Sequence, residues 1–421
     1  IEILKGSSSL NGANAMGGTV HLRNELLLTD GYNSNIGVSF GSFDTLISNY
    51  NTRFKDGNWA GNFSFSSLDT ANDRPHSKFE SLSSSFLIEN QLTDDLTANF
   101  LGLGYDNYLG TNFNKNFPVS PNSYQETVHF LISPQIEVKT DAWDATVNYS
   151  YSEDELNYTP SWNLLYWTEQ ENVDFFSNLL LNERSTLQFG LGYSTSRFFR
   201  EGNFLNSWEQ TYSSLGIRHE ITKDTELDGN IRFGDYSDFK NAETYDFKVR
   251  TSISENLSVY GKYALGFAPP EALDIYEFPP TYPGNVNLKA EESQNYEVGF
   301  SYNTKENNYW SLTYFYTDYE NLIDSSYRNI NKTIANGFEL SSRNYLNDYF
   351  RINSSMTMMR SKNKDEAFLE RRPEFFGSIS LIYQKEAFMF GTELNLKYQT
   401  KEKDFTHPTD PYYKWVDADD Y

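Results

Sequence analysis

Apolar and polar residues alternate along 387–400, the clearest pattern in this chain. The alternate positions on one face carry Phe388, Phe390, Leu394, Leu396 and Tyr398. Because successive side chains of a strand point to opposite sides, one face of this stretch meets an apolar environment and the other meets water. A tilted strand of about 9–11 residues crosses a bilayer as part of a barrel. The stretch therefore predicts a strand of a transmembrane β-barrel.

The same alternation recurs along nearly the whole chain. Together with the turn-forming residues between the runs, it predicts strands at 33–42, 46–55, 58–69, 79–90, 95–107, 127–138, 142–154, 170–181, 185–198, 211–221, 224–235, 244–253, 256–265, 293–304, 308–320, 331–345, 348–361, 373–384, 388–400 and 413–421. One such strand alone would favour a half-buried sheet of a soluble protein. About 20 of them favour a membrane barrel, because open twisted sheets rarely exceed about ten strands.

The predicted connections alternate between tight turns and long loops. Tight turns are expected at 55–58, 140–141, 222–224, 254–256, 346–348 and 384–386. Long loops are expected at 69–78, 107–126, 155–169, 199–210, 266–292, 361–372 and 401–412, with shorter exceptions at 42–45 and 236–243. Short turns on one rim and long loops on the other are typical of outer-membrane barrels. The fold class is therefore predicted as all-β, a large antiparallel transmembrane β-barrel.

Composition supports one large unit and excludes several classes of protein. The 421 residues contain no linker or charge block, and 17% of them are aromatic. Mean hydropathy is −0.64, and no run of about 18 apolar residues occurs, which excludes a helical membrane protein. A net charge of −24 argues against nucleic acid as a partner. Cysteine is absent, so disulfides and thiolate metal sites are excluded.

The first 24 residues differ from the barrel pattern. They are predicted to form a strand, a bend rich in glycine, serine and asparagine, and a second strand. Barrels of about 22 strands enclose a plug, and the place of this segment before the first barrel strand suits the end of such a plug. We therefore expect a plug remnant at 1–24 and a barrel at 25–421. We also expect the chain to be a fragment, because Ile1 is not a start residue and the last predicted strand reaches Tyr421.

Several motifs resemble the TonB-dependent outer-membrane receptors. Residues 1–24 resemble the end of the family's plug domain, with its glycines at Gly6, Gly12, Gly17 and Gly18. Further resemblances lie at Gly41–Thr45, at Phe267–Pro269 with Gly284–Ser293, and at Asp318–Asp324 with Asn336–Glu339. Val286 and Ala290 replace prolines that are usual in the third of these motifs. Residues 285–384 are most similar to the cobalamin (vitamin B12) receptor branch.

The resemblance implies a bacterial outer-membrane receptor that actively takes up a large scarce solute, a cobalamin-like corrinoid or a ferric siderophore. It implies a barrel of about 22 strands, so that most of the plug would precede Ile1 and about two strands would follow Tyr421. The expected partners are outer-membrane lipid, a small-molecule or metal-chelate ligand, and the TonB energy-transducing complex, reached through a segment before Ile1. A passive porin-like channel and an adhesive outer-membrane barrel remain alternatives.

Candidate binding residues lie in the predicted long loops. A possible ligand face is formed by Trp162, Trp167, Glu271, Asp274, Tyr276, Phe278 and Tyr282. The alternative for these residues is a lipid-interface girdle or loop packing. Asp69, Asn72 and Asp73 could supply oxygen ligands to Ca²⁺, although solvated loop residues are the more ordinary interpretation. No other cofactor is expected, and no catalytic motif occurs, so an enzyme is not predicted.

Overall fold

The computed structural model describes residues 2–5, 16, 18–21, 25–73, 76–111, 123–159, 164–276, 284–304, 307–324, 327–363, 372–385, 390–399, 403–405 and 415–417. Within these ranges, no helix has the length and apolarity needed to cross a membrane. The short helix α1 spans Ala272–Ile275.

The strands of the main sheet are β3 Gly31–Gly41, β4 Thr45–Asp56, β5 Trp59–Thr70, β6 Phe79–Gln91, β7 Leu96–Gly110, β8 Tyr124–Lys139, β9 Trp143–Thr159, β10 Leu164–Asn182, β11 Ser185–Arg200, β12 Asn203–Thr222, β13 Thr225–Tyr236, β14 Ala242–Ser252, β15 Leu257–Ala268, β16 Glu291–Asn303, β17 Tyr309–Ile323, β18 Asn329–Tyr345, β19 Phe350–Asn363, β20 Phe375–Lys385 and β21 Phe390–Gln399. Two small sheets accompany them: β1 Glu2–Lys5 with β2 Gly18–His21, and β22 Lys403–Phe405 with β23 Trp415–Asp417.

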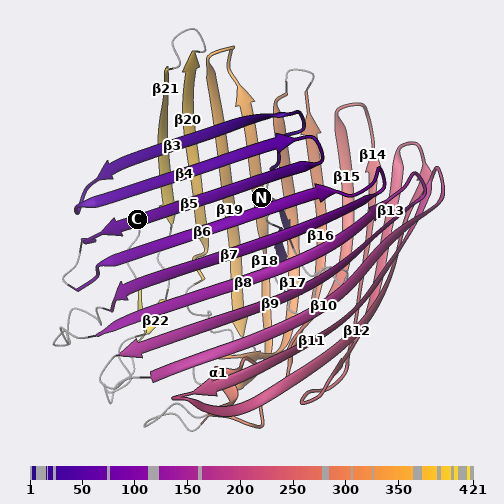
Figure 1. Cartoon of the computed structure of the whole chain (residues 1–421). Helices are drawn as coiled ribbons and strands as arrows, with labels where there is room; N and C mark the ends of the chain where they lie inside the picture. Colours follow the sequence, from indigo (N-terminus) through magenta and orange to yellow (C-terminus); the bar gives the residue numbers. More distant parts are fainter. Residues whose placement is uncertain are drawn as a thin grey trace.

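The nineteen strands β3 to β21 follow one another in chain order round a closed barrel, in which β21 neighbours β3 (Figure 1). Each consecutive pair in the chain is antiparallel, as in the ladder from Asp56↔Trp59 to Leu46↔Asp69 between β4 and β5. The tight turn between these two strands contains Gly57, whose φ of 55° favours glycine. The predicted antiparallel barrel is confirmed.

The alternation of apolar and polar residues corresponds to the two faces of the barrel wall. On β16, Tyr296, Val298 and Phe300 are exposed, whereas the intervening Asn295 and Glu297 are buried. Large exposed apolar side chains lie at alternate positions on most other strands too. A closed sheet with one apolar face is stable in a bilayer when that face is turned outward. The polar face therefore lines the lumen.

Tyrosines form a continuous row on the outward face of β14 to β17. The rings of Tyr245 and Tyr263 lie 5.8 Å apart, those of Tyr263 and Tyr296 lie 4.8 Å apart, and those of Tyr296 and Tyr316 lie 6.2 Å apart, all measured between centroids. Tyrosine combines an apolar ring with a polar hydroxyl, which suits the boundary between hydrocarbon and headgroups. This tyrosine row therefore marks that boundary on the wall.

Several predictions from the sequence are corrected by the structure. The predicted strands 142–154 and 170–181 are too short, because β9 reaches Thr159 and β10 begins at Leu164. The predicted strand 413–421 is not a barrel strand in its described part, because Trp415–Asp417 pairs with Lys403–Phe405 in a separate sheet. The predicted strand 211–221 is too short and the predicted long loop 199–210 is wrong, because β11 ends at Arg200 and β12 begins at Asn203. The residues missed at its start mix polar and apolar side chains without alternation, because Phe204, Leu205 and Trp208 fall on both faces among polar residues.

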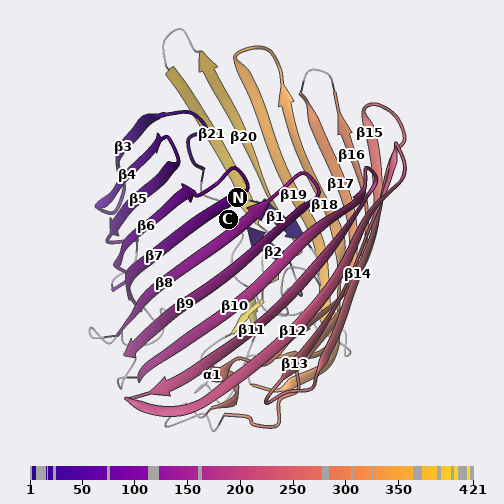
Figure 2. The same cartoon turned by 45° about the vertical axis from the view of Figure 1, so that its right-hand side comes forward.

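The two N-terminal strands β1 and β2 form a hairpin within the ring of barrel strands (Figure 2). Nearby, Glu25 forms an ion pair with Arg53 of β4 at 3.0 Å, and Met16 lines a cavity on the opposite wall. The assignment of 1–24 to a plug domain stays a prediction.

Candidate functional site

A cavity of about 590 Å³, here called the lumenal cavity, lies against the inner faces of β16 to β19. Its lining is Met16, Glu291, Asn295, Glu297, Thr313, Phe315, Thr317, Tyr319, Leu322, Ile323, Ala335, Glu339, Met359, Ser361 and Arg372. The register brings these residues together from four strands, for example Asn295 opposite Thr317 and Thr317 opposite Ala335. The result is a mixed polar and apolar surface with three carboxylates and one guanidinium.

Two hydrogen bonds hold polar groups of this cavity in place. Asn295 Nδ2 donates to Thr317 Oγ1 at 2.8 Å, and the backbone N–H of Ile323 donates to Glu291 Oε1 at 2.6 Å. The residue Asn295 is only 4% exposed, yet its Oδ1 has no hydrogen-bond partner among the described residues. A buried acceptor without a donor is unfavourable, so this oxygen favours a bound solute or water that donates to it.

The inner wall next to this cavity is rich in charge and aromatic rings. We call it the charged wall: Asp174, Tyr212, Arg232, Asp246, Tyr260, Lys262 and Glu297. The guanidinium of Arg232 lies 3.5 Å from the centroid of the Tyr212 ring, whose hydroxyl donates to Asp174 Oδ1 at 2.7 Å. The Tyr260 hydroxyl donates to Glu297 Oε2 at 3.4 Å. These contacts compensate charges that are removed from water.

The inner faces of β3 to β6 have a different chemistry. We call this part the neutral wall: Asn35, Asn49, Asn51, Ser64, Ser66, Ser83 and Ser85, which all line a second cavity of about 460 Å³. Asn51 Nδ2 donates to Asn62 Oδ1 at 2.7 Å and to Ser64 Oγ at 2.8 Å. Ser66 Oγ donates to Asn49 Oδ1 at 2.9 Å.

Part of the predicted ligand face packs at the rim of the barrel. The Asn206 amide of β12 donates to the Tyr276 hydroxyl, and the Tyr276 ring lies 6.5 Å from that of Trp208. The N–H of Glu271 donates to Asp274 Oδ2 at 2.8 Å across the start of α1, and burial raises the pKa of the Asp274 carboxyl. These contacts fix the loop after β15 to the end of β12.

The structure does not bring all the predicted ligand residues together. Trp167 stacks on Phe199 with centroids 4.9 Å apart, whereas Trp208 of the Tyr276 cluster packs on the neighbouring residue Phe198 at 4.5 Å. Phe198 and Phe199 point to opposite sides of β11, so the two aromatic clusters lie on opposite faces of the wall. Trp162, Phe278 and Tyr282 lie outside the described residues.

The motif that begins at Gly284 anchors the same loop to its other neighbour. Gly284 has a φ of 23°, and a Cβ there would lie 2.2 Å from the Ile275 carbonyl oxygen, so only glycine fits. The adjacent Asn285 donates through Nδ2 to the Tyr327 carbonyl at 2.9 Å. The role of this motif visible in the structure is therefore to position the loop.

The three predicted calcium ligands lie where β5 ends. Lys78 Nζ is 3.6 Å from Asp69 Oδ2 and 2.5 Å from Glu80 Oε1, and the hydrogen bond to Glu80 raises the pKa of Lys78. Asn72 Nδ2 donates to the Ser77 carbonyl, and Asp73 follows in the loop. In the described part of the chain, no group of three or more His, Cys, Asp or Glu residues could hold a metal ion.

Of the four plug-motif glycines, Gly18 is the first residue of β2 and pairs with Lys5. Gly6, Gly12 and Gly17 lie outside the described residues. The sequence analysis did not single out Asn295, Glu297 or Thr317 as site residues. The inward direction of Asn295 and Glu297 was predictable, because these polar residues alternate with apolar residues along β16. The contact of Asn295 with Thr317 was not, because it depends on the register of β16 and β17.

A family model described as "TonB dependent receptor-like, beta-barrel" matches residues 6–421. Among curated proteins, the chain is similar to the vitamin B12 transporter BtuB of Photobacterium profundum, with 24% identity over 209 residues. That match covers 48% of this chain and 34% of the transporter. The matched part thus spans about a third of that relative.

Solved structures share the fold at low sequence identity. A Pseudomonas aeruginosa FpvA bound to a heterologous pyoverdine and iron has a TM-score of 0.82 at 16% identity, covering 100% of this chain and 68% of FpvA. The ferric yersiniabactin uptake receptor FyuA of Yersinia pestis has a TM-score of 0.78 at 15% identity, covering 95% of this chain and 73% of FyuA.

Proposed function

This chain belongs to the TonB-dependent receptor β-barrel family, and we propose that it acts in energy-coupled uptake of a large scarce solute. Members of this family are bacterial outer-membrane proteins, and they are not enzymes. The proposed solute is a cobalamin-like corrinoid or a ferric siderophore. The weak similarity to a vitamin B12 transporter supports the first, and the fold shared with ferric siderophore receptors is compatible with the second.

One observation carries the proposal: a segment before the first barrel strand lies inside a wide polar lumen. A lumen of this width is an open channel unless something fills it. The hairpin of β1 and β2 within the ring, and the contribution of Met16 to the lumenal cavity, support a gated path over an open pore. A gate of this kind requires work, and the proposed source is the TonB complex of the inner membrane.

The test is uptake by a strain in which the gene is deleted and then restored. We expect accumulation of cobalamin or of a ferric siderophore to return with the complete gene, and to be lost again when TonB is absent. Restored uptake that persists without TonB would contradict the proposal. A passive porin, the second candidate, predicts instead a large constitutive conductance of the purified complete protein in planar bilayers.

The rim residues supply a finer proposal about ligand contact. Tyr276 lies at the mouth of the lumen and is part-buried, so one of its ring faces can contact a solute as well as Trp208. Tyr276→Ala should weaken solute binding by about tenfold, because a buried aromatic contact contributes roughly 1–2 kcal/mol. The control is Trp167→Ala on the outer face. Equal binding by the Tyr276 variant and the wild type would discard the contact.

Calcium binding by Asp69, Asn72 and Asp73 also remains a proposal. The ammonium of Lys78 lies at Asp69, so a calcium ion would have to displace it. Isothermal titration of the complete receptor with Ca²⁺ should show binding that Asp73→Asn weakens. Titration without heat of binding would reject this site.

A further inference from the structure

The neutral wall is part of an uncharged stripe that runs down the lumen. Its inward positions meet across the ladders, as Asn51 does with Ser64 and Ser64 with Ser85. Between the long-loop rim and the level of Arg53, every inward position of β3 to β6 carries an uncharged side chain. Arg53 itself is neutralised by Glu25 at 3.0 Å. A solute that moves along this stripe therefore meets no fixed charge above Arg53.

The polar groups of the stripe already have partners. Near the rim, the hydroxyls of Thr45 and Thr70 lie 2.8 Å apart, and deeper in the lumen Ser66 Oγ donates to Asn49 Oδ1. A neutral hydrogen bond exchanged with water contributes only about 1 kcal/mol net, so a further partner gains little at each point. A solute on this surface meets many weak contacts. Passage through a pore requires such contacts, because binding must be weak enough for release.

The other side of the lumen retains what binds to it. Asn295 is 4% exposed and Arg232 is 6% exposed, yet Asn295 Oδ1 and Arg232 Nε have no hydrogen-bond partner among the described residues. Buried groups of this kind hold a partner firmly once it is in place. Met16 of the N-terminal segment lines the lumenal cavity on this side. This side of the lumen therefore suits a stationary partner better than a moving solute.

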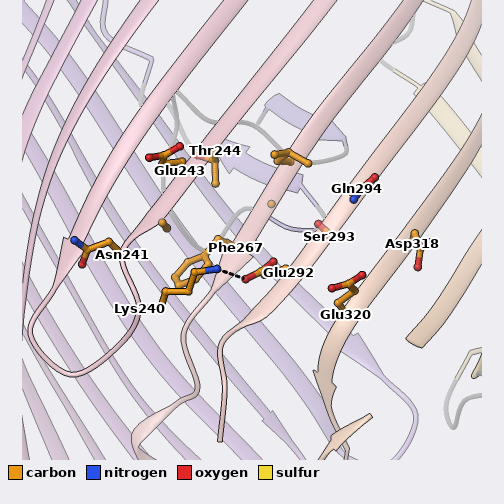
Figure 3. Close-up of a pocket in the computed structure, with 13 residues that line it drawn as sticks. Lys240, Asn241, Glu243, Thr244, Phe267, Glu292, Ser293, Gln294, Asp318 and Glu320 are labelled. Atoms are coloured by element: carbon orange, nitrogen blue, oxygen red, sulfur yellow. Dashed lines mark hydrogen bonds and ion pairs between the residues drawn. The ribbon is translucent and has the colours of Figure 1, made fainter. Parts of the chain in front are cut away.

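Side chains bridge the rim above the charged wall. The ladder between β14 and β15 ends at Asp246↔Ala264, although both strands continue toward the long-loop rim. Beyond that point Phe267 is 4% exposed in an apolar cluster, and Lys240 Nζ lies 3.4 Å from Glu292 Oε1 (Figure 3). The loop after β15 is fixed to the end of β12. These contacts hold this part of the rim together.

The rim above the neutral wall is built differently. Three residues, Ser42–Asp44, connect β3 to β4, and the N–H of Thr45 donates to the Ser42 carbonyl at 3.3 Å across this turn. A compact turn projects less far over the lumen than a packed loop. The stripe is therefore more open to a solute from outside than the charged wall is.

We propose that the solute passes down the neutral wall. This route rests on the proposed uptake function and adds to it the side of the lumen that opens. The N-terminal segment moves away from β3 to β6 when the receptor is energised, and it keeps its contact with β16 to β19. Capture at the rim beside Tyr276 and passage along the stripe are successive steps. Because the stripe has no fixed charge, a solute of either sign passes without being held.

The test uses thiols introduced into the complete receptor in living cells. The 421 residues contain no cysteine, so each introduced thiol is unique among them. Ser83→Cys places a thiol in the stripe on β6. The matched control is Ser341→Cys on the inward face of β18, where the serine is likewise half-buried. The probe is fluorescein maleimide, and the unmodified receptor measures labelling elsewhere.

The reaction rates of the two thiols should differ during uptake. Ser83→Cys should react about tenfold faster when both the transported solute and TonB are present, because opening exposes it. Ser341→Cys should react at the same rate with and without them. After labelling, the Ser83→Cys receptor should still bind the solute but take it up about tenfold more slowly, because a bulky group fixed in a pore obstructs passage.

Three results would overturn this route: equal acceleration at the two thiols, acceleration at Ser341→Cys alone, or no acceleration at Ser83→Cys. Undiminished uptake by the fully labelled Ser83→Cys receptor would do the same. Failure of the proposed function looks different, because uptake by the unmodified receptor would then not require TonB. TonB-dependent uptake with equally accelerated thiols would remove the route and leave the proposed function intact.

Discussion

The neutral wall of β3 to β6 and the charged wall of β10 to β16 face the same lumen, but their polar side chains find hydrogen-bond and charge partners in different ways. On the neutral wall, small amides and hydroxyls bond to one another, as Ser66 does to Asn49. On the charged wall, Arg232 and Glu297 are 6% exposed and depend on specific partners. A neutral polar group that loses its partner can bond to water, whereas a buried charge cannot do so without rearrangement. The neutral wall should therefore tolerate substitution, and the charged wall should not.

The largest difference is expected between two arginines. Arg232→Ala should lower the free energy of unfolding by about 3 kcal/mol, because it removes a buried guanidinium that lies on the Tyr212 ring and attracts the part-buried Asp174 carboxylate. The matched variant Arg53→Ala on β4 should lower the free energy of unfolding by less than about 1 kcal/mol, because its partner Glu25 is largely exposed. Urea unfolding in detergent measures both. Equal losses in the two variants would remove the distinction between the walls.

Two inward-facing glycines give the next largest contrast. A Cβ at Gly299 would lie 2.1 Å from Tyr260 Cε1, so Gly299→Ala must displace the ring that donates to Glu297. We expect this variant to lower the free energy of unfolding by about 2 kcal/mol. At Gly37, a Cβ would meet only the Asn49 side chain at 3.9 Å, and Gly37→Ala should change stability by less than about 0.5 kcal/mol. A shift in melting temperature for the Gly37 variant as large as for Gly299 would contradict this.

A single amide on the neutral wall should have a smaller effect. Asn51→Ala removes hydrogen bonds to Asn62 and Ser64, and the expected loss is about 1 kcal/mol in urea unfolding. The remaining groups can bond to water in the adjacent cavity. A loss comparable to that of the Arg232 variant would mean that the neutral wall is as specific as the charged one.

The smallest effect is expected at the rim beside the charged wall. Tyr276→Phe keeps the ring on Trp208 but removes the acceptor for Asn206. The loss of about 0.5 kcal/mol should make amide exchange near α1 about twofold faster. Hydrogen exchange followed by mass spectrometry measures it, with peptides of β4 as the unchanged reference. Unchanged exchange near α1 would show that ring packing alone holds the loop.

The strands and their faces were predictable because alternation acts through the nearest neighbours in the chain. Within the predicted strand 185–198, the alternation of apolar and polar residues matches the outward and inward faces of β11. Strand ends were less predictable, as at β12, because polar and apolar residues do not alternate between Asn203 and Gln210. The register was not predictable from alternation, since a shift of two residues preserves every face. The meeting of Asn295 with Thr317, and the end of the ladder at Asp246, both depend on that register.

Strand length varies round the barrel, with 11 residues in β3 and 20 in β12. At about 3.3 Å per residue, the longer strand extends roughly 65 Å and the shorter one roughly 35 Å. The short turns keep one end of each hairpin at a common rim, so the additional residues of the longer strands lie at the other rim. The mouth is consequently cut obliquely, high at β12 and low at β3. The wall at β12 therefore projects beyond the wall at β3, and the entrance to the lumen faces the side of the shorter strands.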